Sequence, residues 1–157
     1  MLRPFFDWLQ TLTYSQEFRL STWMFPSVDA IHLVALAVFA GSLLIVDLRL
    51  LGFGLKERPV DVVSREAQPW LVGSFVCLLL TGASMIAGNG DKYYYSDFFW
   101  EKMTVLVVAF VFTFTLRRRI ALAGETGVRP IWRKLTAVAS LAMWLFVAVW
   151  GRLIGLA

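Results

Sequence analysis

Four apolar runs, separated by shorter polar connections, set the hydropathy pattern of the chain. They cover about residues 28–51, 69–88, 97–117 and 131–151. Twenty residues of α-helix extend for about 30 Å, which is the thickness of the hydrocarbon core of a bilayer. The pattern therefore predicts an all-α fold, a bundle of four transmembrane helices.

Residues 1–25 follow a different pattern, in which aromatic residues alternate with polar ones. Asp7, Glu17 and Arg19 interrupt any long apolar stretch, and Pro4 suits the first turn of a helix. Such a segment is typical of an amphipathic helix that lies in the headgroup layer. We therefore expect an N-terminal interfacial helix, followed by a four-helix transmembrane domain over residues 26–157.

The composition agrees with a membrane protein. Hydrophobic residues make up 59% of the chain and charged residues only 17%, whereas soluble domains place about a quarter of their residues in charge. The mean hydropathy is +0.68, so lipid has to cover much of the apolar surface. The net charge of +4 does not indicate a nucleic-acid partner, because the basic residues lie at helix ends and in connections.

The basic residues also predict an orientation. Ten of the 15 Lys and Arg residues lie in the connections after the first and third runs, against five elsewhere. Loops rich in Lys and Arg stay in the cytoplasm. We therefore expect a multi-pass protein of the bacterial inner (cytoplasmic) membrane, with both termini extracytoplasmic.

Three ionisable residues from different runs fall at one predicted depth near the outer face. His32, the only histidine, lies about one turn inside the first run, Lys102 about one turn inside the third, and Arg152 at the end of the fourth. Charged or ionisable residues inside a membrane are costly and tend to mark functional sites. We therefore treat these three residues as a candidate cofactor-binding site.

The residue types indicate the class of ligand. An imidazole binds a metal or a polar oxygen, and Lys and Arg bind carboxylates. Haem b or another porphyrin fits this set with His32 as iron ligand, and a quinone headgroup fits part of it. The leading hypothesis is a redox-type site in the outer leaflet, as in a small membrane oxidoreductase, with no catalytic residue assigned.

The same residues also have a structural interpretation. His32 would then hydrogen-bond a neighbouring helix, while Lys102 and Arg152 extend to the headgroups. A stripe of small residues in the second run, including Gly73, Cys77 and Thr81, favours close helix packing. The competing hypothesis is therefore a non-catalytic membrane module, either a homo-oligomeric scaffold or an accessory subunit of a larger membrane complex.

A second polar position lies at the inner end of the first run. Asp47 falls at the same predicted depth as the arginine triplet at residues 117–119. A carboxylate inside a membrane requires a partner. We therefore expect an interhelical ion pair, Asp47 with Arg117, that holds the first helix against the third.

Three segments carry a resemblance to a known family. They are F-P-S-V-D-A-I-H-L-V-A-L-A-V-F-A-G-S-L-L-I-V-D-L-R-L-L-G, then W-E-K-M, and finally S-L-A-M-W-L-F-V-A-V-W-G-R-L-I-G. Over residues 23–155 the chain resembles an uncharacterised family of bacterial four-helix integral membrane proteins. The resemblance implies the same four-helix architecture.

More distantly, a histidine in the first run and a lysine early in the third are similar to two further families. These are the membrane-bound, oxygen-independent protoporphyrinogen oxidases and the copper-resistance membrane proteins of the CopD type. In the oxidase family the two residues are implicated in haem binding and activity. The resemblance implies these roles for His32 and Lys102.

Overall fold

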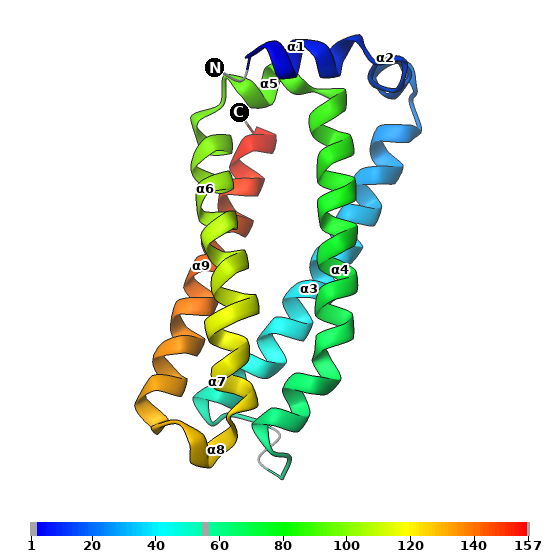
Figure 1. Ribbon diagram of the computed structural model, residues 1–157. Helices are drawn as coiled ribbons and strands as arrows, with labels where there is room; N and C mark the ends of the chain where they lie inside the picture. The colour runs from blue at the N-terminus through cyan, green and yellow to red at the C-terminus, as the bar shows by residue number, and fades with distance from the viewer. Residues whose placement is uncertain (1–2, 55–56, 157) are drawn as a thin grey trace.

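The computed structural model describes residues 3–54 and 57–156 and shows an all-α fold that is 89% helical (Figure 1). The elements are α1 (Arg3–Thr11), α2 (Thr13–Leu20), α3 (Met24–Leu51), α4 (Val60–Gly88), α5 (Gly90–Tyr94), α6 (Asp97–Phe112), η1 (Thr113–Arg117), α7 (Arg118–Leu122), α8 (Gly124–Gly127) and α9 (Pro130–Leu156). The prediction of an all-α protein is confirmed.

Three helices are long and apolar enough to cross a bilayer. They are α3, α4 and the Pro130–Ile154 part of α9. In addition, α6, η1 and α7 follow one another without a break and form one helix of 26 residues. The chain is therefore a small multi-pass membrane protein with three candidate spans.

The long helices form two pairs that stand side by side (Figure 1). α3 packs along α4, α6 packs along α9, and α3 also contacts α9. At one end of the bundle α1, α2 and α5 lie across the helix ends, and both termini lie at this end. We call it the roof end, and the opposite end, where α7 and α8 lie, the loop end.

Several helix boundaries differ from those predicted. α4 begins at Val60 rather than at residue 69, and it continues through Pro69. A proline inside a helix removes one backbone hydrogen bond, but Val60 and Val63 are buried against neighbouring helices and hold the preceding turns in place. Helix α3 likewise begins four residues early, at Met24.

The N-terminal segment contains two short helices rather than the single helix predicted. The break falls at Leu12, whose backbone is extended, with φ −66° and ψ 136°. On either side lie threonines, which have low helix propensity, and the Thr11 hydroxyl donates to the Trp8 carbonyl at 2.7 Å. Thr11 thus satisfies a carbonyl at the end of α1 and favours a helix end there.

Gly52 sets the end of α3. Gly52 has φ +91°, a left-handed conformation that glycine adopts without steric cost. Its N–H bonds the Arg49 carbonyl at 3.1 Å, and the Phe53 N–H bonds the Leu48 carbonyl at 2.8 Å. These two bonds form a Schellman motif, which satisfies carbonyls that the helix end leaves free.

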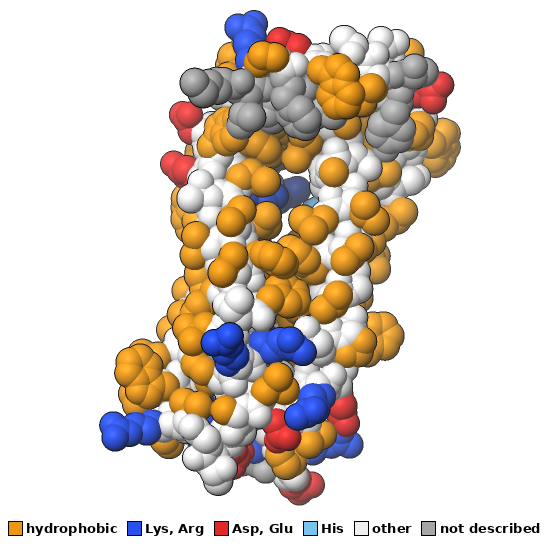
Figure 2. Space-filling view, in the orientation of Figure 1, with side chains coloured by type: hydrophobic (Ala, Val, Ile, Leu, Met, Phe, Trp, Pro, Cys, Tyr) orange, Lys and Arg blue, Asp and Glu red, His pale blue; other side chains and the backbone are white. Residues whose placement is uncertain are grey.

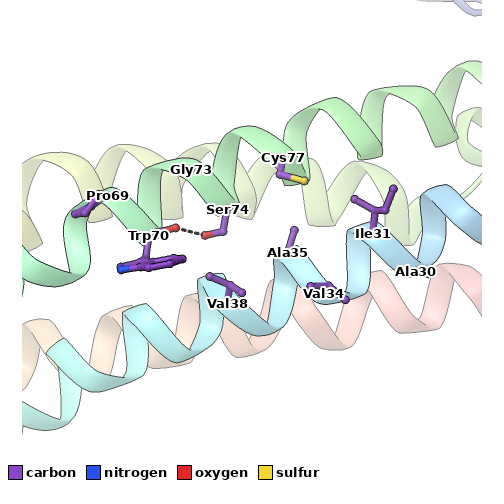
Figure 3. A pocket seen from close by; sticks show the side chains of 10 residues that line it. All are labelled: Ala30, Ile31, Val34, Ala35, Val38, Pro69, Trp70, Gly73, Ser74 and Cys77. Atoms are coloured by element: carbon purple, nitrogen blue, oxygen red, sulfur yellow. Dashed lines mark hydrogen bonds between the residues drawn. The ribbon is translucent and has the colours of Figure 1, made fainter.

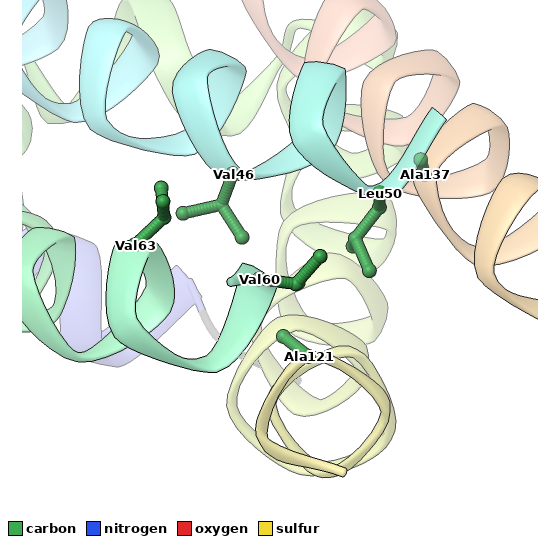
Figure 4. Packing of buried hydrophobic residues seen from close by; sticks show 6 residues of the cluster. All are labelled: Val46, Leu50, Val60, Val63, Ala121 and Ala137. Carbon is green, nitrogen blue, oxygen red and sulfur yellow. The ribbon is translucent and has the colours of Figure 1, made fainter. Parts of the chain in front are cut away.

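Buried hydrophobic residues form three clusters between the helices. One cluster, at the roof end, contains Phe99 and Ile154, with Ile86, Tyr93, Tyr94 and Met103 packed against them. The other two form layers. Near the middle of the bundle an aromatic layer contains Phe39, Phe75, Phe110, Phe114 and Trp144, with ring centroids 4.5 Å apart for Phe39–Trp144 and 4.9 Å apart for Phe75–Phe110. Toward the loop end an aliphatic layer contains Val46, Leu50, Val60, Val63, Ala121 and Ala137 (Figure 4). The two alanines are fully buried, and such small side chains let helices approach closely.

Candidate functional site

His32 lies in the roof-end half of α3 and is held by α4. Its Nδ1 lies 2.7 Å from the hydroxyl oxygen of Thr81. The Thr81 hydroxyl has one hydrogen, and it lies 2.7 Å from the Cys77 carbonyl, an acceptor one turn back that helical threonines commonly use. The Thr81 oxygen is then an acceptor toward the imidazole, so Nδ1 carries the proton.

This contact sets the tautomer of a neutral His32. When Nδ1 carries the hydrogen, Nε2 keeps a lone pair that can accept a hydrogen bond or bind a metal. No residue in the described part of the chain hydrogen-bonds Nε2. The half-buried imidazole is therefore fixed at one nitrogen and open to a ligand at the other.

The backbone of α4 passes close to the edge of the imidazole at Gly82. A Cβ built on Gly82 would lie 3.7 Å from His32 Cε1, an ordinary van der Waals distance. An alanine would fit at this position and a longer side chain would project in front of the ring. The glycine thus leaves the ring edge uncovered.

Lys102, on α6, faces the same region from the other helix pair. A Cβ built on Gly151 of α9 would lie 3.1 Å from its ammonium nitrogen, so the lysine extends along α9 where that helix has no side chain. The side chain is half-buried, and its charge acts electrostatically on His32. Among the described residues, none forms a hydrogen bond or ion pair with the Lys102 ammonium.

The space between these two residues is open in the space-filling view. Figure 2 shows a hollow below the roof, between α4 and α6, in which a pale blue histidine and a blue Lys or Arg side chain are visible. The histidine is His32, because the chain has only one. The aromatic layer closes the hollow toward the loop end, where Phe75 of α4 stacks on Phe110 of α6. We refer to this space as the hollow.

The roof end of the hollow carries further polar groups. Asp29 of α3 acts electrostatically on both His32 and Tyr93, and Tyr93 belongs to α5 in the roof. Burial and, to a smaller extent, the Asp29 carboxylate raise the pKa of Tyr93 above its usual value of 10.0. Tyr93 is therefore a neutral phenol at physiological pH, with a hydrogen to donate.

Two of the three predicted site residues are brought together, and the third is set apart. The Arg152 side chain is exposed, and no described contact joins it to His32 or Lys102. Helix α9 continues to Leu156, and adjacent helical residues point about 100° apart. Because Gly151 faces Lys102, the next residue points away from it.

Thr81, Gly82 and Gly151 also belong to the surroundings of the site, although the sequence pattern does not single them out for it. Thr81 was placed in a packing stripe, although one signal was available. In antiparallel helices, residues at similar distances from the roof-end termini lie at similar depths. Thr81 lies seven residues before Gly88, the end of α4, and His32 lies eight residues after Met24, the start of α3. A hydroxyl at the depth of a buried imidazole is a natural partner for it.

A second polar cluster lies between the aromatic layer and the aliphatic layer. Arg117 Nε lies 2.6 Å from Asp47 Oδ1, and the Ser140 hydroxyl donates to Asp47 Oδ2 at 2.7 Å. Arg117 also donates to the Leu43 carbonyl at 3.0 Å. The Asp47 and Arg117 side chains are 0% and 4% exposed, so the cluster joins α3, η1 and α9 as a closed network.

The π-helical turn η1 is part of this cluster. It covers Thr113–Arg117, and π-turns insert an extra residue that changes how side chains are directed. At its first residue Thr113 accepts a hydrogen bond from the Trp144 indole at 2.9 Å, and at its last Arg117 reaches Asp47. Both ends of the turn are thus fixed by contacts with other helices.

Ion pairs also hold the loop end. The buried Arg49 guanidinium pairs with Glu125 of α8 and donates through Nε to the Arg58 carbonyl at 2.8 Å. Arg58 in turn pairs with Glu66 at 2.8 Å, in an exposed position. These contacts connect the end of α3 to both connections at the loop end.

A separate groove runs between α3 and α4 and has a volume of about 790 Å³. Figure 3 shows its lining, which includes Val34, Val38, Trp70 and Cys77. Its serine, Ser74, donates to the Trp70 carbonyl at 2.6 Å. Since none of the lining residues is charged, the groove lacks the polar groups that orient a ligand, and we place the candidate site in the hollow.

The donor set limits the metal chemistry of the hollow. The described residues contain no group of three or more His, Cys, Asp and Glu side chains that could hold a metal ion. A single imidazole with an unbonded Nε2 could ligate haem iron, because a porphyrin would supply the other nitrogen ligands. The residues present therefore fit a haem better than a free metal ion.

Comparison with known proteins gives a family and no named relative. No curated protein and no solved structure matches the sequence. The expected similarity to the protoporphyrinogen oxidases and to the CopD-type proteins thus has no named homologue to support it. The sequence matches a family of unknown function (DUF6644) over residues 5–157, and the chain therefore belongs to this family.

Proposed function

We propose that this protein binds haem, or a closely related porphyrin, in the hollow, with His32 Nε2 as the iron ligand and Lys102 as the partner of an acidic substituent. The observation that carries the proposal is the contact of His32 Nδ1 with the Thr81 hydroxyl, which leaves Nε2 without a hydrogen-bond partner among the described residues. Metal-bound imidazoles almost always donate their other N–H to an acceptor. Thr81 is that acceptor here, at 2.7 Å.

The state of Lys102 supports an anionic ligand. An ammonium held away from water without a partner is costly, and no described residue pairs with the Lys102 ammonium. The carboxylates of a haem are of the opposite charge and form strong, charge-assisted hydrogen bonds with lysine. When bound, the haem would supply one-electron redox chemistry, while this chain holds and orients it.

We further propose that the 26-residue helix formed by α6, η1 and α7 is a fourth membrane span. It would extend for about 39 Å and packs along α9. Its acidic and basic residues lie at its two ends, namely Asp97, Glu101 and Lys102 near the roof and the arginines at 117–119 near the loops. Of these six charged residues, four are exposed, whereas Lys102 is half-buried and Arg117, which pairs with Asp47, is buried.

The placement of the basic residues supports one orientation. Ten of the 15 Lys and Arg residues belong to residues 49–65 and 117–134, which comprise the two connections after α3 and α7 and the adjoining helix ends, and blue side chains gather toward the loop end in Figure 2. By the positive-inside rule the loop end is cytoplasmic. The roof, the hollow and both termini then belong to the extracytoplasmic side of a bacterial inner membrane.

Absorption spectroscopy tests the haem proposal directly. Haemin titrated into the purified protein in mild detergent should give a saturable Soret band that is shifted from that of free haemin. In His32→Ala this shift should be absent, and haemin should bind at least about tenfold more weakly. Ser84→Ala is the matched control, because within the described part of the chain its hydroxyl bonds only the Leu80 carbonyl of its own helix. An unshifted spectrum, or equal binding by His32→Ala, contradicts the proposal.

A quinone is the second candidate, and it is favoured by the pairing of a hydrogen-bond acceptor with a donor. Nε2 of His32 would accept the hydroxyl hydrogen of a hydroquinone, while the Lys102 ammonium would donate to a quinone oxygen. Equilibrium dialysis with decylubiquinone distinguishes the two ligands. Binding that requires His32 and excludes haemin would favour the quinone.

If neither ligand binds, the competing hypothesis gains support. The His32–Thr81 contact is then an interhelical hydrogen bond, and the protein is a non-catalytic membrane module. Native mass measurement in mild detergent would show whether such a module is a homo-oligomer or depends on another subunit.

A further inference from the structure

We infer that the ligand reaches His32 sideways from the bilayer, through the opening between α4 and α6 past Gly82, and is therefore a membrane-soluble molecule with a polar or acidic head. This inference rests on the proposed function, since it concerns the same hollow. It specifies how the ligand arrives and the chemical class to which it belongs.

The roof covers the route from the aqueous side. α1, α2 and α5 lie across the end of the bundle (Figure 1). Phe18 of α2 is 1% exposed, and its ring sits so close to Gly88 that a Cβ there would overlap the ring. Ser15, one turn earlier, is fully buried. Helix α2 is therefore seated tightly on the end of α4.

The side of the hollow between α4 and α6 is the open one. The other helix neighbours, α3 with α4, α6 with α9 and α3 with α9, pack against each other. α4 and α6 meet at the Phe75–Phe110 stack, with ring centroids 4.9 Å apart. Just below the roof a second cluster, of Phe99 and Ile154, has Ile86 of α4 and Met103 of α6 packed against it. Between the stack and this cluster the two helices separate, and Figure 2 looks through the gap onto the histidine.

Helical spacing places a glycine at the edge of this opening. Two turns from Phe75 toward the roof, on the same face of α4, lies Gly82. The equivalent position on α6, two turns from Phe110, is Met103, next to Lys102. The ring edge of His32 lies behind Gly82, with 3.7 Å between Cε1 and a Cβ built there.

The surroundings of the opening define the ligand. At the depth of a membrane span, a gap between helices faces acyl chains rather than water. Only a molecule that dissolves in the bilayer arrives by this route. Its head must suit the Nε2 lone pair of His32 and the Lys102 ammonium, while its body lies on the aromatic layer below.

Thiol labelling tests the route without any cofactor. In a Cys77→Ala background, His32→Cys places a thiol in the hollow, and Lys92→Cys places one on the exposed face of α5 as a reference. The protein is reconstituted in phosphatidylcholine vesicles and treated with lipophilic pyrenyl maleimide or with a charged, membrane-impermeant disulfonated maleimide. Relative to the reference thiol, the lipophilic reagent should label position 32 at least about tenfold faster than the charged one.

Substitutions at Gly82 then test the opening itself. Gly82→Leu should slow labelling of position 32 by the lipophilic reagent about tenfold, because its side chain lies in front of residue 32. Gly82→Ala should leave the rate nearly unchanged, since its Cβ makes an ordinary contact. Ala83→Leu adds the same bulk at the adjacent, exposed position and should also leave the rate unchanged.

Two results would overturn the inference. One is equal labelling of position 32 by the charged and lipophilic reagents, which needs no Gly82 variant and so remains decisive if Gly82→Leu does not fold. The other is a folded Gly82→Leu protein that labels as fast as its parent. Failure of the haem proposal looks different, because the wild-type protein would then not bind haemin while the labelling pattern persists.

Discussion

The two halves of the bundle each contain a buried polar centre, and the centres differ in how well they are satisfied. Toward the loop end, both carboxylate oxygens of Asp47 have partners, from Arg117 and Ser140. Toward the roof end, His32 is bonded at one nitrogen and the Lys102 ammonium meets no polar partner among the described residues. A closed network stabilises a structure, whereas an open one leaves groups that a ligand can satisfy.

The two centres also differ in whether the protein offsets the free-energy cost of burying charge. Each centre places charge inside a bundle that is mostly apolar, which is unfavourable in either half. At the loop end the protein offsets the cost with its own hydrogen bonds and joins three elements. At the roof end no described residue offsets the cost of burying the Lys102 charge, and we attribute this difference to ligand binding.

The largest effect is expected from breaking the closed centre. Asp47→Ala should lower the free energy of unfolding by about 3–5 kcal/mol, because it leaves the buried Arg117 guanidinium unpaired. Chemical denaturation in mild detergent, followed by far-ultraviolet circular dichroism, measures the change. The double variant Asp47→Leu with Arg117→Met removes both charges and should recover much of the loss. A loss below about 1 kcal/mol for Asp47→Ala would mean that this pair contributes no more than a weak surface pair. It would contradict the claim that the closed centre stabilises the fold.

A smaller effect is expected at the junction of the roof with α4. Gly88→Ala should cost about 1–3 kcal/mol through overpacking against Phe18 and should expose α2 to hydrogen exchange. Gly82→Ala is the matched control, since it makes the same change in the same helix where a Cβ has room. Equal exchange of α2 in both variants would show that Phe18 does not hold the roof.

The open centre should respond in the opposite way to the closed one. Lys102→Met removes a charge that has no described partner and leaves an unbranched side chain only one atom shorter. Its effect on stability should be neutral or slightly favourable, within about 1 kcal/mol, while haemin binding weakens about tenfold. Denaturation and haemin titration on one preparation measure both quantities. A large loss of stability would mean that Lys102 is structural, as Asp47 is.

The smallest expected effect concerns alkaline pH. Burial raises the pKa of Tyr93 above 10.0 in the folded protein, so the folded state holds this proton more tightly than the unfolded state does. Its contribution is present below the unfolded pKa and is lost as pH rises through the folded pKa. Tyr93→Phe should therefore reduce the fall in melting temperature above about pH 10. If the melting temperature falls equally at alkaline pH in both proteins, the Tyr93 phenol is not buried at the roof end.

Much of this architecture follows from patterns in the sequence, and the exceptions have identifiable causes. Long apolar runs predict helices well, because every backbone group in a membrane needs an internal partner. The Asp47–Arg117 contact was expected from depth alone. The early start of α4 was not, because Pro69 reads as a helix start while tertiary packing of Val60 and Val63 carries the helix through it.

The site was less accessible to sequence reasoning than the fold. His32 and Lys102 stand out because charged or ionisable residues are rare in apolar runs. The partner of His32 did not stand out, because threonine and glycine are common in packing stripes. Arg152 shows the limit of an argument from depth, since a residue at the correct depth on α9 points away from Lys102. Rotation about the helix axis depends on packing between helices that a linear pattern does not encode.

The seat of Phe18 on Gly88 also determines the order in which the protein assembles. Helix α2 leaves the ribosome early, but the surface on which it rests belongs to the far end of α4, at residue 88. Before α4 is synthesised, α2 can contact α3, where Phe18 lies 5.9 Å from Phe25 between ring centroids, but it lacks its seat at Gly88. We therefore expect the roof to close only after the second long helix is inserted, and His32 to stay uncovered on that side until then.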